Sequence, residues 1–163
     1  MIDSLAAEFT NSSPVSIPVL ILRILGAVIF CGVIGLEREF RNSAAGIRTN
    51  MLIGLAATVF TLVTLQMMTT LGQNIDTTRF DPIRLVEAVT AGIAFLAAGV
   101  IIYARGDVHG LTTGASLWLS AAIGLCVGLG MWAVALTATI AGIVILWLLR
   151  KTEVAAGIKD EKD

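Results

Sequence analysis

Charged residues are scarce in this chain. Only 14% of its 163 residues are charged and 56% are hydrophobic, and the mean hydropathy is +0.89. Soluble domains carry about a quarter charged residues, so this composition argues against a water-soluble globule. It also excludes intrinsic disorder, which needs low hydrophobicity and a high net charge. A net charge of −1 provides no electrostatic attraction to nucleic acid.

Cysteine and histidine are also rare. Cys31 and Cys126 both lie in apolar stretches, where cysteine behaves as a small buried hydrophobe. Together with the single His109 they have no metal-site spacing. The sequence contains no GxxxxGK[ST], HExxH or GxSxG motif. We therefore expect neither an enzyme nor a bound cofactor.

Most of the sequence consists of long runs of uncharged residues. No charge occurs between Arg48 and Asp76 or between Glu87 and Arg105, and residues 111–149 form 39 residues without charge or histidine. A helix crosses a bilayer with about 20 apolar residues. Because the runs are continuous and do not alternate, they indicate helices and not a transmembrane barrel.

Glycines at 128 and 130 permit a turn that divides the last run in two. No Lys or Arg precedes the first run, so we expect no removable signal peptide. The predicted fold is all-α, a bundle of about five transmembrane helices. It occupies residues 1–149 and precedes a short tail at 150–163. The predicted helices are 17–36, 49–71, 83–103, 113–129 and 131–149.

Basic residues indicate the orientation. With the N-terminus outside, eight Lys and Arg lie in inner segments, against two, Arg79 and Arg84, in outer segments. This bias predicts a periplasmic N-terminus and a cytoplasmic C-terminus. In a bacterium the membrane would be the cell inner membrane.

Small residues recur at helical spacing. Ala27, Cys31 and Gly35 share one face of the first helix, and Gly110–Gly114 and Gly124–Gly128 bracket the fourth. Such faces let helix backbones approach closely in lipid. They favour either packing within the bundle or a homodimer through the first or fourth helix, and spacing alone leaves both open.

Charges inside a span indicate function because they are costly unless compensated. Arg23 lies inside the first helix, and Glu87 lies at a similar depth inside the third, whose start Asp81 marks as a helix cap. We expect an Arg23–Glu87 ion pair, with Arg84 as a third member. The alternative is that Arg23 extends to the headgroups while Glu87 pairs with Arg84.

A first loop on the predicted cytoplasmic side is dense in charge. The order of Glu37 and Arg41 favours an (i, i+4) ion pair. The loop motif comprises Glu37, Arg38, Glu39, Arg48 and Thr49.

A second loop lies on the same predicted side. We expect Thr112 or Thr113 to cap the fourth helix, whose start would accept Glu37, Glu39 or a lipid phosphate. Alternatively, both loops are solvated interface segments. Because Mg²⁺ prefers oxygen ligands, Glu37 and Asp107 are weak metal candidates. The second loop motif comprises Asp107, His109, Gly110, Thr112 and Thr113.

Several motifs together resemble the bacterial MgtC/SapB family of membrane proteins. They are Gly35–Glu39, Ala45–Leu52, Arg84, Gly92–Gly99 and Gly110–Trp118, and the resemblance covers about residues 19–142. An arginine like Arg23 also occurs in the first helix of the family. Where the family usually has glycine in the third helix, this chain has Ala94 and Ala97. Longer members carry a cytoplasmic C-terminal domain, whereas a short tail is expected here.

The resemblance implies an inner-membrane protein linked to growth at low Mg²⁺ and, in some pathogens, to survival inside macrophages. Members are thought to modulate partner membrane proteins, including ATP synthase. We therefore expect a non-enzymatic regulator acting in magnesium homeostasis or envelope stress adaptation. Its expected partners are the lipid bilayer, other membrane proteins and a second copy. The alternative is a Mg²⁺ or other cation transporter or channel, with Glu87 and the inner carboxylates lining its path.

Overall fold

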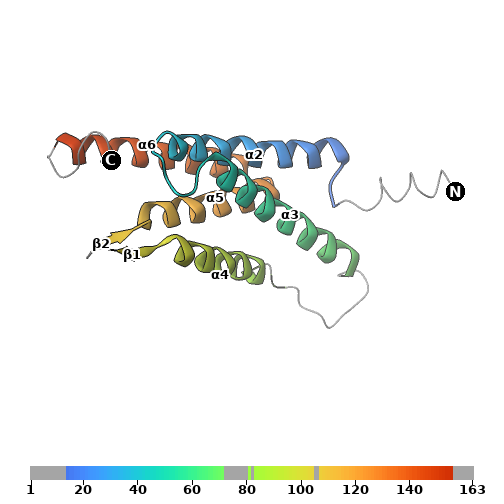
Figure 1. The fold of residues 1–163 in the computed structure, drawn as a ribbon. Coiled ribbons are helices and arrows are strands. Elements are labelled where there is room, and N and C mark those ends of the chain that lie inside the picture. The colour runs from blue at the N-terminus through green and yellow to red at the C-terminus, as the bar shows by residue number, and fades with distance from the viewer. Residues whose placement is uncertain (1–13, 72–80, 82, 105–106, 156–163) are drawn as a thin grey trace.

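The computed structural model describes residues 14–71, 81, 83–104 and 107–155 (Figure 1). The described helices confirm the all-α membrane class, because four of them are long and apolar enough to cross a bilayer. A shorter apolar segment, Trp132–Leu148, lies in the last helix. The helices are α2 (Ile17–Glu39), α3 (Ile47–Leu71), α4 (Ile83–Val100), α5 (Leu111–Leu129) and α6 (Trp132–Ala155), and a hairpin of β1 (Ile102–Ala104) and β2 (Asp107–His109) joins α4 to α5.

Local sequence signals explain several helix ends. The carboxylate of Asp81 accepts a hydrogen bond from the Ile83 N–H at 3.0 Å, which confirms the predicted cap of α4. α5 ends at Gly130 in the left-handed conformation, and its last carbonyls accept hydrogen bonds from the Gly130 and Met131 N–H groups. The predicted turn between the fourth and fifth helices is confirmed.

The predicted helix 83–103 is too long. α4 ends at Val100, and the chain forms an antiparallel hairpin in which Tyr103 pairs with Val108. β-branched and aromatic residues such as Ile102 and Tyr103 favour strands. Gly110 then starts α5 at a φ of +87°, and a side chain there would meet the Val100 carbonyl. The close return to Val100 therefore needs glycine.

α5 is the central helix of the described bundle, whereas α4 is peripheral. Buried residues make up 61% of the most apolar window of α5 but only 11% of that of α4. One apolar cluster joins α5 to α3 and α4, and a second joins it to α2 and α6. α2 and α6 lie on one side of α5, and α4 lies on the other (Figure 1). The first cluster comprises Ala45, Ile53, Ala57, Ile93, Leu117, Ala121 and Leu125, and the second comprises Ala27, Cys31, Ile34, Ile123, Val127 and Ala135.

The backbones of α5 and α3 are in direct contact at Gly124 and Gly54. A Cβ placed on Gly124 would meet the Gly54 carbonyl and would lie 2.9 Å from the Ala57 Cβ. The Thr58 hydroxyl donates to the Gly124 carbonyl at 2.8 Å. Lipid gives helices no hydrophobic reason to associate, so close packing and hydrogen bonds must hold them together.

The small-residue faces of α2 and α5 are occupied within the chain. Cys31 packs against Gly54 of α3, Gly114 faces Ala97 of α4, and Gly128 faces Thr61 of α3. This packing supports the intramolecular interpretation and leaves neither face free for a homodimer. Ala97, which stands where the family usually has glycine, contributes to this packing because Gly114 of α5 packs against it.

Replacing Gly124 with alanine tests the close contact. Gly124→Ala should lower the free energy of unfolding by about 1–3 kcal/mol, because the added methyl group must push α3 away. Thermal or denaturant unfolding of the purified protein in detergent measures this loss. Gly92→Ala is the matched control, since a Cβ there meets nothing within 4 Å. Equal losses for the two variants would contradict the argument.

Candidate functional site

Arg23 binds the C-terminal end of α5. Its Nη1 donates to the Gly128 carbonyl at 2.6 Å, and the guanidinium is partly buried. Carbonyls at a helix C-terminus carry partial negative charge, so a cation is stabilised there. Within the described residues the Nε of Arg23 is buried without a hydrogen-bond partner. Among the described residues the charge is thus compensated by backbone and not by an acidic side chain.

The predicted Arg23–Glu87 ion pair is not formed. Glu87 is exposed on α4, which lies across α5 from α2 (Figure 1). The described ion pairs join Glu37 to its neighbours, and none of them includes Arg23, Arg84 or Glu87. The alternative Arg84–Glu87 pair is therefore absent from the described residues as well. Equal depth in the membrane says nothing about the side of the bundle on which a residue lies, which is why the prediction was wrong.

Because no ion pair joins Arg23 and Glu87 among the described residues, we predict that the two residues contribute independently to stability. Arg23→Gln should lower the free energy of unfolding by about 1.5–3 kcal/mol, the usual contribution of a hydrogen bond to a charged group. The cost should add to that of Glu87→Gln within about 0.5 kcal/mol. A double-mutant cycle of detergent unfolding measures the coupling. A coupling energy well above about 0.5 kcal/mol would instead support an Arg23–Glu87 ion pair.

The charged loop motif forms a cluster around Glu37 at the end of α2. Arg38 Nε donates to one carboxylate oxygen of Glu37 at 2.7 Å, and Arg41 Nε donates to the other at 3.0 Å. The expected (i, i+4) pair is confirmed. Arg38 is buried although it is charged, so Glu37 compensates a guanidinium that is largely removed from solvent. Both Glu37 oxygens are engaged by arginine, which weakens the case for this residue as a metal ligand.

Glu39 caps α3, not α5. Its Oε2 accepts the Ile47 N–H at 3.1 Å, so a carboxylate sits at the positive start of the helix that follows it in the chain. The expected docking of Glu37 or Glu39 at the start of α5 is wrong because closer donors take both groups. Arg48 and Thr49 lie exposed on the first turn of α3.

A buried hydrogen-bond network joins this loop to the bundle core, and our sequence reasoning missed it. Asn50 Nδ2 donates to the carbonyls of Ala45 at 3.2 Å and Gly46 at 2.9 Å. Its Oδ1 accepts the Ser120 hydroxyl at 2.7 Å. The Ser120 carbonyl in turn accepts the thiol of Cys31 at 3.3 Å. The available signal was an amide side chain at the start of an uncharged span, where polar side chains bond across helices.

Asn50 should be a main determinant of stability. Asn50→Ala leaves the Ser120 hydroxyl and the Ala45 carbonyl without their partner, whereas the Gly46 carbonyl still accepts the backbone N–H of residue 50. A buried unsatisfied group costs about 1–3 kcal/mol. Unfolding in detergent should show a loss of that order. Thr49→Ala, at the exposed neighbouring position, should change stability little. Asn50→Ala with wild-type stability would remove the network from the argument.

The second loop motif differs from its prediction at the helix start. Gly110 is the N-cap of α5, and no side chain caps it. Thr112 is exposed, and the Thr113 carbonyl accepts the Ser116 hydroxyl. α5 therefore starts before the threonines, which lie in its first turn and cannot cap it. His109 is exposed, and the Asp107 side chain lies outside the described part. No three His, Cys, Asp or Glu side chains gather into a metal site among the described residues.

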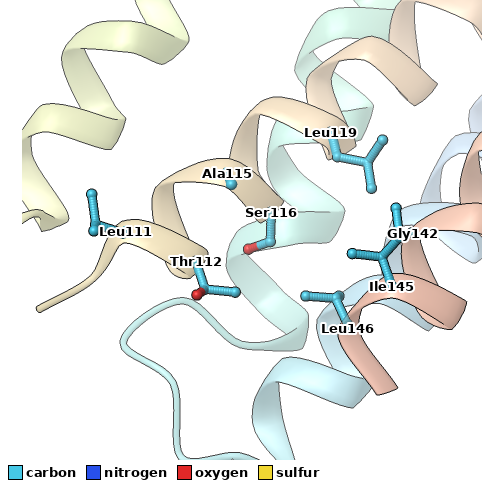
Figure 2. Close-up of a pocket in the computed structure, with 8 residues that line it drawn as sticks. All are labelled: Leu111, Thr112, Ala115, Ser116, Leu119, Gly142, Ile145 and Leu146. Atoms are coloured by element: carbon cyan, nitrogen blue, oxygen red, sulfur yellow. The ribbon is translucent and has the colours of Figure 1, made fainter. Parts of the chain in front are cut away.

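An open groove of about 380 Å³ lies between α5 and α6. Aliphatic side chains from both helices converge on it, with the Ser116 hydroxyl at its wall (Figure 2). The lining suits an acyl chain or an apolar side chain better than an ion. Its residues are Leu111, Thr112, Ala115, Ser116, Leu119, Gly142, Ile145 and Leu146.

These features define a polytopic helical membrane protein whose buried polar groups bind mainly to one another and to backbone. The chain belongs to the MgtC family, whose family profile matches residues 24–155. This match confirms the resemblance that the sequence motifs indicated.

Relatives support the same assignment. The chain is 41% identical over 120 residues to "Protein MgtC" of Salmonella typhimurium, covering 74% of this chain and 48% of the relative. It is 35% identical over 126 residues to "Putative magnesium transporter YhiD" of Escherichia coli K12, covering 77% of this chain and 58% of the relative. An uncharacterized Haemophilus influenzae protein is 40% identical over 119 residues, covering 72% and 50%. The chain thus spans about half the length of these relatives. No solved structure matches it.

Proposed function

We propose that this chain is a non-enzymatic regulator of partner membrane proteins in the bacterial inner membrane, acting under magnesium limitation or envelope stress. The proposed orientation places the N-terminus in the periplasm and the α2–α3 loop and C-terminus in the cytoplasm, following the bias in basic residues. The Escherichia coli relative carries the name "Putative magnesium transporter YhiD", and the family resemblance supplies the link to low Mg²⁺.

The observation that carries the proposal is the fixed conformation of the α2–α3 loop. Glu39 binds the backbone at the far end of this loop, and Asn50 binds two of its carbonyls. Asn50 is itself held by Ser120 of α5. A loop tied to the core on both sides loses little conformational entropy on binding, and such preorganisation favours association.

The surface of this loop has the chemistry of a contact site. The Phe40 side chain is 78% exposed and lies beside Arg41 in the chain. Aromatic and arginine side chains are enriched at protein interfaces, and a few such residues carry most of the binding energy. Phe40 is therefore the proposed anchor, and the exposed Glu39 and Arg48 would select the partner by charge.

A cation transporter is the second candidate, favoured by the name of the Escherichia coli relative and by the buried polar side chains along α3 and α5. They include Asn50, Thr58, Thr61, Ser116 and Ser120. In the structure these groups are hydrogen-bonded to one another or to nearby carbonyls. A cation crossing here would have to displace those bonds. Glu87, the intramembrane acid proposed to line such a path, is exposed on the outside of α4.

Two measurements separate the candidates. In liposomes loaded with a Mg²⁺ indicator, the purified protein should give no more flux than protein-free vesicles. Flux that Glu87→Gln abolishes would establish transport and overturn the regulator.

In cells lacking the gene, the regulator predicts a growth defect at low Mg²⁺ that the wild-type gene corrects. Phe40→Ala should fail to correct it, because truncating an interface anchor weakens binding about tenfold or more. Phe60→Ala is the matched control, since Phe60 is also an exposed aromatic residue but lies within α3. Both variants must reach wild-type levels in the membrane. Full correction by Phe40→Ala would remove the loop as the contact site.

A further inference from the structure

α4 packs against the bundle on one side only. Ile93 and Ala97 are its buried residues, and they face α5 and α3. Gly92 and Gly99 of the same helix have nothing within 4 Å of a built Cβ. Phe95, on the opposite side from Ile93, is 80% exposed, the largest exposed fraction among the large hydrophobic residues described.

The uncovered side of α4 carries both charge and small residues. At 100° per residue, one stripe of the helix holds residues that are all exposed and lie away from the buried Ile93. We call this stripe the α4 outer face. It consists of Arg84, Glu87, Ala88, Ala91, Phe95 and Ala98.

The two charges on this face have no ionic partner among the described residues. They could pair with each other, but Arg at position i and Glu at i+3 is the less favourable order on a helix, and the pair is not formed. Glu87 lies more than one turn inside α4, and an uncompensated charge within a span is costly. A surface that compensates both charges must place a carboxylate beside Arg84 and a basic group beside Glu87.

A second copy of the same face is such a surface. We propose that two copies pack along the α4 outer face around a two-fold axis normal to the membrane. Arg84 then pairs with Glu87 of the partner subunit, and Glu87 pairs with Arg84 of the partner subunit. A two-fold interface is self-complementary by symmetry. Ala88 and Ala91 allow the helices to approach closely, and Phe95 supplies the large apolar surface to be buried.

This interface differs from the homodimer that was one alternative for the small-residue spacing, because the small-residue faces of α2 and α5 are already filled within the chain. It is also independent of the proposed regulatory function. A protein with no partner, or a transporter, could form the same dimer.

Charge reversal tests the reciprocal pairs. Two differently tagged copies are expressed together, and their co-purification from detergent-solubilised membranes is measured. Arg84→Glu and Glu87→Arg should each reduce self-association at least about tenfold, because each brings like charges together. Co-expression of the Arg84→Glu copy with the Glu87→Arg copy should restore association. Thr49→Glu, which introduces a charge at an exposed site on α3, should leave it unchanged. Loss without mutual rescue, or no loss, overturns the proposal.

Cysteine cross-linking in intact membranes tests the face itself. Ala91→Cys should give a disulfide-linked species of twice the monomer mass on oxidation. Ala122→Cys, exposed on α5, and the wild-type chain with its two native cysteines should not. A cross-link from Ala91→Cys to a chain of another mass, or equal dimer from Ala122→Cys, would show that something other than a second copy covers the face.

Discussion

The close approach of α5 to α3 is the contact on which the rest of the bundle depends. In lipid, apolar burial does not drive helices together, so association needs packing at short range and hydrogen bonds. The absence of a side chain at Gly124 brings its carbonyl within reach of the Thr58 hydroxyl. Because α5 is thereby fixed against α3, Ser120 meets Asn50, and through Asn50 the α2–α3 loop is held. One glycine contact in the core therefore determines the conformation of a surface loop.

Among the described residues, backbone carbonyls compensate Arg23 and Asn50 within the bundle, whereas Glu37 compensates the buried Arg38 at the end of α2. Arg23 donates to Gly128, and Asn50 donates to Gly46. Each acceptor belongs to a helix end or to a loop, where carbonyls lack partners within a helix. A cation at such a site needs no buried acid and avoids the desolvation of a second charge. Polar residues in the spans thus lie close to the helix ends and loops whose carbonyls they bind.

Features that depend on local sequence could be predicted, whereas those that depend on lateral neighbours could not. The apolar runs predicted the helices, Asp81 predicted the start of α4, and the spacing of Glu37 and Arg41 predicted their ion pair. The partner of Arg23 was missed because depth along a helix carries no information about which helix lies beside it. The same limit applies to Asn50, whose acceptors and donors come from a loop and from α5. The end of α4 was misplaced because apolar residues continue from the helix into the hairpin.

The two proposed surfaces have different geometric relations to the core. The α2–α3 loop is joined to α5 through Asn50, whereas the α4 outer face lies on the opposite side of α4 from α5. α2 and α4 also flank α5 on different sides (Figure 1). Two copies joined along α4 would therefore keep their α2–α3 loops apart and on the same side of the membrane. Two identical loops held in one assembly can bind a dimeric partner with an affinity greater than that of either loop alone, provided the partner spans both. Dimerisation through α4 would thus strengthen a regulatory contact at the loop without contributing a residue to it.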